Sequence, residues 1–210
     1  MTRNLDLFLA VPDVAADTAD PLDRHYTPEW MTEALLEALG PYALRDATIL
    51  EPCAGEGHIA RVLERHGHHV TCHDINPEVC GAHRDRYIHE RDFLTYNPHP
   101  PDCWDWIITN PPYGDGLPAI FLRRAIAMAQ KGVAFLVWSS FLEGCDDRID
   151  LLRSRDLRQI IHLPRGNFIT PGKRHTGPSK WPVWLIYRPG LPWPHFGRIE
   201  TVWVGKEARP

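Results

Sequence analysis

The chain has 210 residues, of which 43% are hydrophobic and 24% charged, and its formal net charge at pH 7 is −4. This composition is typical of one folded domain of ordinary size, and it excludes an intrinsically disordered chain. No apolar run approaches the ~20 residues that a membrane-spanning helix needs, and the N-terminus lacks the features of a signal peptide, so we expect a cytoplasmic protein.

The first predicted elements follow a leader, residues 1–23, that shows no periodicity. Thr27 is a good N-cap and Pro28 a good first helical residue, so a helix is predicted from there to Gly40. Strands are predicted at 48–50, 69–74 and 87–91. A helix at 58–66 and a short helix from 76 to about 83 lie between them.

The second half continues the alternation of strands and helices. Strands are predicted at 104–109, 133–138, 159–163 and 183–187, with helices at 117–130 and 145–155. This order indicates an α/β fold, with a Rossmann-like, mostly parallel seven-stranded sheet flanked by helices. We expect one catalytic domain over 24–190 and a C-terminal tail or edge strand over 191–210.

The five cysteines are spread along the chain without a C-x-x-C pair, which favours reduced thiols over a disulfide framework. Cys72, His73, Cys80 and His83 raise the question of a zinc site. Cys72 and His73 are adjacent, however, and neighbouring residues in a strand point to opposite faces. We therefore expect no metal ion.

A tight turn, EPCAGEG at 51–57, joins the first predicted strand to a helix. Gly55 and Gly57 would let backbone N–H groups approach a ligand closely. The position of the third glycine of the dinucleotide fingerprint holds Ala60, which that fingerprint tolerates, so the turn alone leaves a nicotinamide cofactor open. Asp74 ends the next strand, where a carboxylate would accept both ribose hydroxyls, and a nucleoside-containing cofactor is expected in either case.

A second turn, Asn110-Pro111-Pro112-Tyr113, follows the strand predicted at 104–109. The two prolines restrict the backbone, which leaves the side-chain oxygen of Asn110 and the carbonyl of Pro111 as rigid acceptors. Two acceptors can hold the two hydrogens of an exocyclic amino group, and Tyr113 offers a flat face for a planar base. The position at a strand end favours this interpretation over a plain proline-rich turn.

Together these motifs resemble those of class I S-adenosylmethionine-dependent methyltransferases of the N6-adenine DNA methyltransferase type, and most of all the short phage and prophage forms. The resemblance runs from about Tyr26 to Tyr187 and is carried by YTP at 26–28, the 51–57 turn, Asp74, Asp92-Phe93 and the 110–113 turn. It implies S-adenosyl-L-methionine as cofactor and DNA as partner, with the target adenine flipped out of the duplex.

The resemblance also implies a role for each matched residue. The methionine part of the cofactor would be held by Glu51, Pro52, Cys53, Ala54, Gly55 and Gly57, and bordered by Tyr26, Thr27 and Pro28. Asp74 and Ile75 would bind its ribose and adenine, and Asp92 and Phe93 would complete the adenine site. The catalytic residues would be Asn110, Pro111, Pro112 and Tyr113, and Asn110 would also border the cofactor.

Charge is distributed unevenly along the chain. Residues 1–120 carry 20 acidic and 8 basic side chains, whereas residues 121–210 carry 7 acidic and 15 basic ones. A basic segment can mark a polyanion-binding face, although charge alone fits a solvated surface equally well. We expect DNA contacts in this segment, and the candidates, together with Tyr113, are Arg165, Lys173, Arg174 and Lys180.

Three alternatives stay open from the sequence. An N-methyltransferase could act on RNA bases, or on a glutamine amide of a protein. The chain could also be a nucleic-acid-binding module without catalytic activity on the same fold. The basic C-terminal half and the Tyr26-Thr27-Pro28 motif favour nucleic acid over protein as the substrate.

Overall fold

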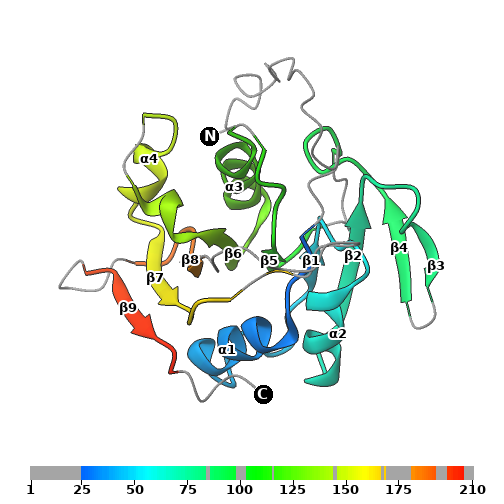
Figure 1. Ribbon diagram of the computed structural model, residues 1–210, viewed down its shortest axis with the longest axis horizontal. Coiled ribbons are helices and arrows are strands. Elements are labelled where there is room, and N and C mark those ends of the chain that lie inside the picture. The colour runs from blue at the N-terminus through cyan, green and yellow to red at the C-terminus, as the bar shows by residue number, and fades with distance from the viewer. Residues whose placement is uncertain are drawn as a thin grey trace.

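The computed structural model describes residues 25–83, 86–97, 103–114, 116–143, 146–166, 168, 181–192 and 198–205. Over these residues the chain forms a nine-stranded sheet in the order β3-β4-β2-β1-β5-β6-β8-β7-β9, with helices on both faces (Figure 1). Five of the eight neighbouring strand pairs are parallel. The mostly parallel α/β sheet is therefore confirmed, and it contains two strands more than the seven expected.

The elements have the following bounds. The helices are α1 (Glu29–Leu39), α2 (His58–Arg65), α3 (Leu117–Met128) and α4 (Ile149–Leu152), with a 3-10 helix at Ser139–Leu142. The strands are β1 (Ile49–Glu51), β2 (Val70–Asp74), β3 (Gly81–His83), β4 (Arg86–Glu90), β5 (Trp106–Thr109), β6 (Gly132–Trp138), β7 (Leu157–His162), β8 (Pro182–Tyr187) and β9 (Glu200–Trp203).

The core lies on both faces of the sheet. Helices α1 and α2 cover one face, and α3 and α4 cover the other (Figure 1). Strands β5, β6 and β8 are buried nearly throughout, which explains why they read as continuous apolar runs. A buried hydrogen bond of 2.8 Å from the indole N–H of Trp184 to the carbonyl of Met31 ties α1 to β8.

The short helix expected at 76–83 is absent, and this prediction was wrong. The side chain of Asn76 accepts a hydrogen bond of 3.0 Å from the N–H of Glu78, which closes a turn instead of starting a helix. Gly81 then has a φ of +95° and opens β3, which pairs with β4 in an antiparallel hairpin. So few residues between Pro77 and Gly81 cannot offset the cost of starting a helix.

Two predicted helix ends also differ from the structure. Helix α1 begins at Glu29, with Pro28 rather than Thr27 at the N-cap position. The hydroxyl of Thr27 is engaged elsewhere, because it accepts a hydrogen bond from the side chain of Asn110. Helix α4 covers Ile149–Leu152 and is much shorter than the helix expected at 145–155. The N–H of Asp156 donates to the hydroxyl of Ser154, which closes a turn before β7.

Strand β9 lies at one edge of the sheet, parallel to β7, within the segment expected to be a tail or edge strand. The ring of Trp203 stacks on His162 of β7 with 4.1 Å between centroids. Helices long and apolar enough to cross a membrane do not occur in the described parts of the chain.

Candidate active site

The predicted motifs meet at one edge of the sheet. Strands β4, β2, β1 and β5 are neighbours, and all three of their pairings are parallel. Their carboxyl ends therefore lie at the same edge, where the 51–57 turn begins at the end of β1 and Asp74 ends β2, and where Asp92 and Asn110 follow β4 and β5. This is the edge at which ligands bind in α/β sheets of this kind.

The turn after β1 is tied to the end of β2 by Asp74. One carboxylate oxygen of Asp74 accepts a hydrogen bond of 2.7 Å from the N–H of Gly55, and the other accepts one of 2.8 Å from Asn76. Burial raises the pKa of this carboxyl, although these N–H groups oppose the shift. Each oxygen has a further lone pair, so the carboxylate can still accept hydrogen bonds from a ligand.

Gly55 and Gly57 both have left-handed backbone conformations, with φ of +51° and +76°. Gly55 also has no room for a side chain, because an added Cβ would lie 2.7 Å from the ring of Tyr26. That ring stacks on His58, the first residue of α2, with 5.1 Å between centroids. Burial, with Arg61 nearby, lowers the pKa of His58. The Tyr26 ring thus forms a wall beside the turn.

Glu51 links the 51–57 turn to the start of α2. Its side chain is buried, and its carboxylate accepts a hydrogen bond of 3.0 Å from the N–H of Ala60 in the first turn of α2. Burial raises the pKa of Glu51 well above its usual value, whereas the bond to Ala60 and the charge of Arg86 lower it. This geometry places the Glu51 carboxylate at the start of α2.

Within the same turn, Pro52 and Ala54 are buried and Cys53 is half-buried. The N–H of Ala54 donates to the carbonyl of His73, which gives the turn a second link to β2. Burial, followed by the charge of Asp74, raises the pKa of the Cys53 thiol well above its usual value, so the thiol is not an activated nucleophile.

The predicted adenine contacts differ in their exposure. The Ile75 side chain is exposed beside Asp74 and accessible to a ligand. Asp92 closes the turn after β4, where its two oxygens accept hydrogen bonds from the Leu94 N–H (2.9 Å) and the Thr95 hydroxyl (3.0 Å). Phe93 is buried in the core under α3, so little of its ring is left for a ligand.

Asn110 is buried, and both ends of its amide have partners. The Nδ2 group donates to the carbonyl of His25 at 2.7 Å and to the hydroxyl of Thr27 at 3.1 Å. The Oδ1 atom accepts a hydrogen bond of 2.6 Å from the hydroxyl of Tyr113. Pro111 is also buried. The amide oxygen thus faces Tyr113, and the amide nitrogen faces residues 25–27.

Tyr113 is packed against other rings instead of presenting an open face. It lies 5.7 Å from Phe168, 5.6 Å from Trp138 and 6.0 Å from His25, measured between ring centroids. We call His25, Tyr113, Trp138 and Phe168 the aromatic cluster. His25, Trp138 and Phe168 were not among the residues predicted for the site. Two of them could have been found from their positions, because Trp138 ends β6 and Phe168 follows β7, at the same edge of the sheet as Asn110.

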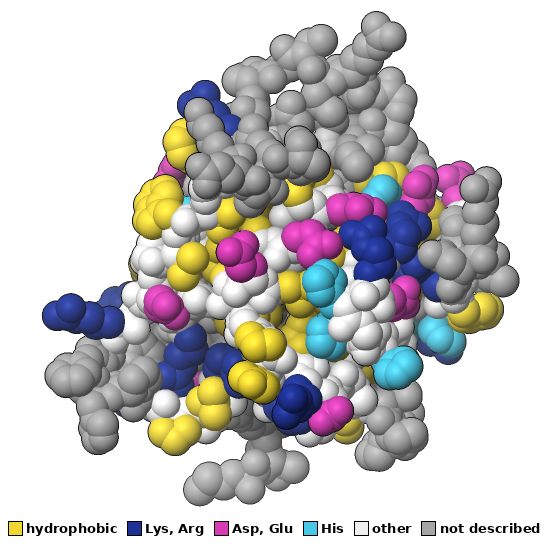
Figure 2. Space-filling model, turned by 90° about the horizontal axis from the view of Figure 1, so that it is seen from below, with side chains coloured by type: hydrophobic (Ala, Val, Ile, Leu, Met, Phe, Trp, Pro, Cys, Tyr) yellow, Lys and Arg dark blue, Asp and Glu magenta, His cyan; other side chains and the backbone are white. Residues whose placement is uncertain are grey.

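Among the predicted DNA contacts, Arg165 is exposed just beyond β7, with its guanidinium 5.0 Å from the centroid of the Trp181 ring. Lys173, Arg174 and Lys180 lie outside the described residues. The face that carries α1 and α2 mixes acidic, basic and histidine side chains (Figure 2). Arg65 pairs there with Glu29 at 2.9 Å, so this face is not a basic surface.

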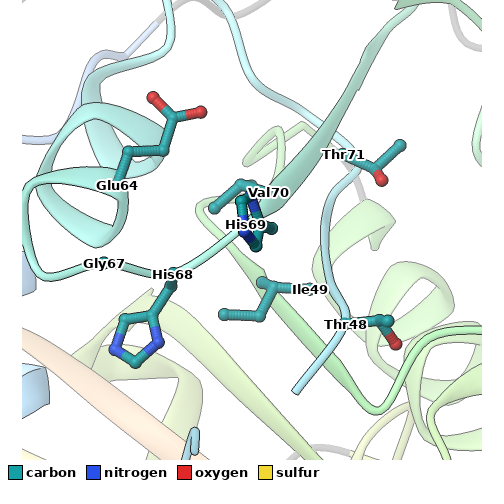
Figure 3. Close-up of a pocket in the computed structure, with 8 residues that line it drawn as sticks. All are labelled: Thr48, Ile49, Glu64, Gly67, His68, His69, Val70 and Thr71. Atoms are coloured by element: carbon teal, nitrogen blue, oxygen red, sulfur yellow. The ribbon is translucent and has the colours of Figure 1, made fainter. Parts of the chain in front are cut away.

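A cavity lies at the opposite end of the strands (Figure 3). Its lining comes from the starts of β1 and β2 and from the end of α2: Thr48, Ile49, Glu64, Gly67, His68, His69, Val70 and Thr71. Because parallel strands place their amino ends together, this cavity is separated from Asp74 and Asn110 by the length of the strands.

No protein family model matches the sequence, and no curated protein matches it. Solved structures do resemble it. One is a Listeria monocytogenes protein described as a class I S-adenosylmethionine-dependent methyltransferase, with a TM-score of 0.62, 16% identity, and coverage of 89% of this chain and 68% of that one. Another is a Pyrococcus horikoshii protein described as an RNA methyltransferase, with a TM-score of 0.59, 15% identity, and coverage of 81% and 90%.

A third similar structure is a Vibrio vulnificus protein described as the modification subunit of a type I restriction enzyme. Its TM-score is 0.58 at 16% identity, and the match covers 91% of this chain but only 52% of that protein, so the chain spans about half of its length. At these identities the likeness concerns the fold. The chain has the Rossmann-like fold of class I S-adenosylmethionine-dependent methyltransferases, which confirms the predicted fold class.

Proposed function

We propose that this chain is an S-adenosylmethionine-dependent methyltransferase that acts on the exocyclic N6 of adenine in DNA. The observation that carries the proposal is the orientation of the Asn110 amide at the carboxyl end of β5. Its nitrogen is held by His25 and Thr27, and its oxygen is directed to Tyr113 in the aromatic cluster.

The residues around the 51–57 turn fit this cofactor. Gly55 and Gly57 allow close approach of a ligand to the backbone, and the start of α2 favours a carboxylate nearby. Asp74 has lone pairs for two ribose hydroxyls, and exposed Ile75 provides an apolar surface for an adenine ring. When bound, the cofactor supplies an activated methyl group on a positively charged sulfur.

The difficult partner in such a transfer is the acceptor amine, because its lone pair is delocalised into the aromatic ring. Hydrogen bonds from its two N–H groups to the Asn110 oxygen and the Pro111 carbonyl would localise that lone pair and stabilise the positive charge that develops on nitrogen. Holding the nitrogen in line with the methyl carbon contributes further, since orientation can supply ~7–11 kcal/mol. The surplus proton leaves to water, so no strong base is required.

The aromatic cluster suits a planar base. Flipping a base out of a duplex costs a few kcal/mol, and stacking on an aromatic ring returns about 1–3 kcal/mol. A base held between two rings needs about 7 Å between them, because carbon atoms pack about 3.5 Å apart. The rings of Tyr113 and Phe168 are 5.7 Å apart, so they must separate to admit a base between them.

Two observations support nucleic acid as the substrate. The C-terminal half of the chain is basic, and exposed Arg165 lies just beyond β7, at the same edge as Asn110. The Vibrio vulnificus protein is described as the modification subunit of a type I restriction enzyme, which favours DNA. The Pyrococcus horikoshii protein, described as an RNA methyltransferase, makes RNA the second candidate.

The test is methyl transfer from labelled S-adenosylmethionine to unmethylated DNA and, in parallel, to RNA. The nucleosides are then identified by mass spectrometry, with Asn110→Ala as the catalytic control. N6-methyladenine from DNA is the expected product. Label in RNA alone would reject DNA as the substrate, and label in neither by an enzyme that binds the cofactor would reject nucleic acid as the acceptor.

A further inference from the structure

One short segment, residues 25–28, contacts both the 51–57 turn, which we call the cofactor turn, and the side-chain amide of Asn110. In Figure 1 the ribbon begins beside β1 and β5 before it turns into α1. The backbone is extended at Pro28, with φ of −57° and ψ of 139°, and a residue before proline favours an extended conformation as well. We call residues 25–28 the bridge segment.

The bridge segment presents alternate residues to opposite sides. The carbonyl of His25 and the hydroxyl of Thr27 accept hydrogen bonds from the amide of Asn110. Tyr26, between them, contacts Gly55 and stacks on His58 beside the cofactor turn. Successive residues of an extended chain point in opposite directions, so this arrangement follows from the local backbone.

The contacts on Asn110 fix which end of its amide faces the aromatic cluster. An amide nitrogen has two hydrogens, and here each has an acceptor, one on His25 and one on Thr27. A flipped amide would place the nitrogen against the Tyr113 hydroxyl and the oxygen against the His25 carbonyl, which has no hydrogen to donate. Only the observed orientation offers an acceptor to an incoming amino group. The His25 carbonyl selects this orientation, and the hydrogen bond to Thr27 holds the amide in place.

We propose that Thr27 is a positioning residue and that the bridge segment links occupancy of the cofactor turn to the orientation of the Asn110 amide. A ligand on the turn touches Gly55 and the Tyr26 ring, which restricts the bridge segment and with it the two acceptors on Asn110. Binding of a ligand at the turn then favours binding of an amino group at Asn110, and the coupling is reciprocal. The kinetic part of this inference rests on the proposed function.

Its test does not depend on activity. In 15N-labelled protein, the side-chain amide signals of Asn110 are assigned by their loss in Asn110→Ala. In Thr27→Val one amide hydrogen loses its acceptor, so we expect it to exchange with water about tenfold faster, and Thr27→Ser should restore slow exchange. Adding S-adenosylhomocysteine should shift these signals in the wild type and much less in Tyr26→Ala at saturating ligand.

Thr32→Val is the matched control. Thr32 is also a buried threonine, in α1, and its hydroxyl has no hydrogen-bond partner among the described residues. This variant should leave the Asn110 signals and turnover unchanged. In methyl transfer, Thr27→Val should lower kcat about tenfold with little change in the KM for DNA. Thr27→Ser should recover most of the wild-type kcat.

The outcomes separate this inference from the proposed function. Wild-type exchange rates in Thr27→Val, or equal effects of Thr32→Val, would overturn the role of Thr27. Asn110 signals that ignore S-adenosylhomocysteine in the wild type would overturn the coupling. If Thr27→Val does not fold, Thr27→Ala, which also removes the hydroxyl, decides the role of Thr27, and the wild-type titration decides the coupling. A wild type that methylates no nucleic acid would reject the proposed function and leave the exchange result standing.

Discussion

The hydroxyl of Tyr113 donates a hydrogen bond of 2.6 Å to the side-chain oxygen of Asn110 and lies 3.2 Å from the carbonyl of Leu136. Tyr113 therefore contributes two separable features to the candidate site. Its ring belongs to the aromatic cluster, and its hydroxyl holds the acceptor that a target amino group would use. Substitutions that remove one feature at a time should give different kinetics.

Tyr113→Phe keeps the ring and removes the hydroxyl. We expect kcat to fall about three- to tenfold, because that is the change in rate that corresponds to the free energy of one hydrogen bond. The KM for DNA should stay near that of the wild type. Tyr113→Ala also removes the stacking surface, worth about 1–3 kcal/mol per base, so KM for DNA should rise at least fivefold or so. Steady-state kinetics of both variants provide the measurement, and equal losses in KM would contradict the separation.

Asn110→Ala removes the amide altogether. By analogy with the loss of a preorganised hydrogen-bonding group at a reacting centre, we expect kcat to fall about 10²- to 10³-fold. The affinity for S-adenosylhomocysteine, measured by calorimetry, should fall much less than kcat, because the link between Gly55 and Asp74 does not involve this side chain. Near-normal turnover in this variant would refute the proposed chemistry.

Much of this site was predictable because parallel strands place their carboxyl ends together. Asp74 and Asn110 are far apart in sequence, and the alternation of strands and helices was enough to bring them to one edge. The position of the glycine turn at the end of β1 followed from the same pattern, whereas its hydrogen bond to Asp74 did not.

The remaining features depend on contacts that local sequence does not encode. The aromatic cluster joins residues from four segments. Phe168 lies beside Tyr113 only because the pairing of β7 with β8 brings the end of β7 to this edge of the sheet. The hairpin of β3 and β4 arises because Asn76 closes a turn and Gly81 adopts a positive φ, which helical propensity does not reveal. The orientation of the Tyr113 ring likewise depends on Trp138 and Phe168, which are distant from it in sequence.

Gly55→Ala tests the close approach of Tyr26 to the cofactor turn. The new Cβ would lie 2.7 Å from the Tyr26 ring in a left-handed backbone, so affinity for S-adenosylhomocysteine should fall about tenfold or more. Gly40→Ala is the matched control, because Gly40 also has a positive φ but nothing within 4 Å of an added Cβ. The control should lose folding stability while keeping its affinity.

Gly55 and Tyr26 also permit a double-mutant cycle. In the background of Tyr26→Ala the ring is gone, so Gly55→Ala should cost less folding stability than it does in the wild type. Stability is measured by urea unfolding at one pH and without ligand. The result then reports the collision between the new Cβ and the Tyr26 ring, and it is independent of any contact of that ring with the cofactor. Strictly additive effects would show that the collision is relieved by other movements.

Glu51→Gln tests the buried carboxyl below the turn. Burial raises the pKa of Glu51 in the folded state, so the folded protein binds more protons than the unfolded one above the usual value of 4.5. This group therefore makes stability fall as pH rises from 4.5 toward its folded pKa. Glutamine keeps an acceptor for the N–H of Ala60 without the charge, so the variant should gain stability relative to the wild type as pH rises.

Urea unfolding of both proteins between pH 5 and 8 measures this difference. Glu37→Gln serves as the control, because Glu37 is an exposed glutamate on α1. A constant difference between Glu51→Gln and the wild type over that range would mean that Glu51 does not titrate there. In that case the charge of Arg86 outweighs burial.

Arg165→Ala tests whether the edge beyond β7 contacts a phosphate backbone. Arg165 is exposed, and its guanidinium lies over the Trp181 ring. Among the residues that the structure describes it has no carboxylate partner, whereas Arg65 on α2 pairs with Glu29. If Arg165 neutralises one phosphate, the plot of log K against log salt concentration should become shallower by about 1 in the variant. Arg65→Ala should leave the slope unchanged, because Arg65 already pairs with Glu29. An equal slope in all three proteins would move the DNA contacts away from Arg165.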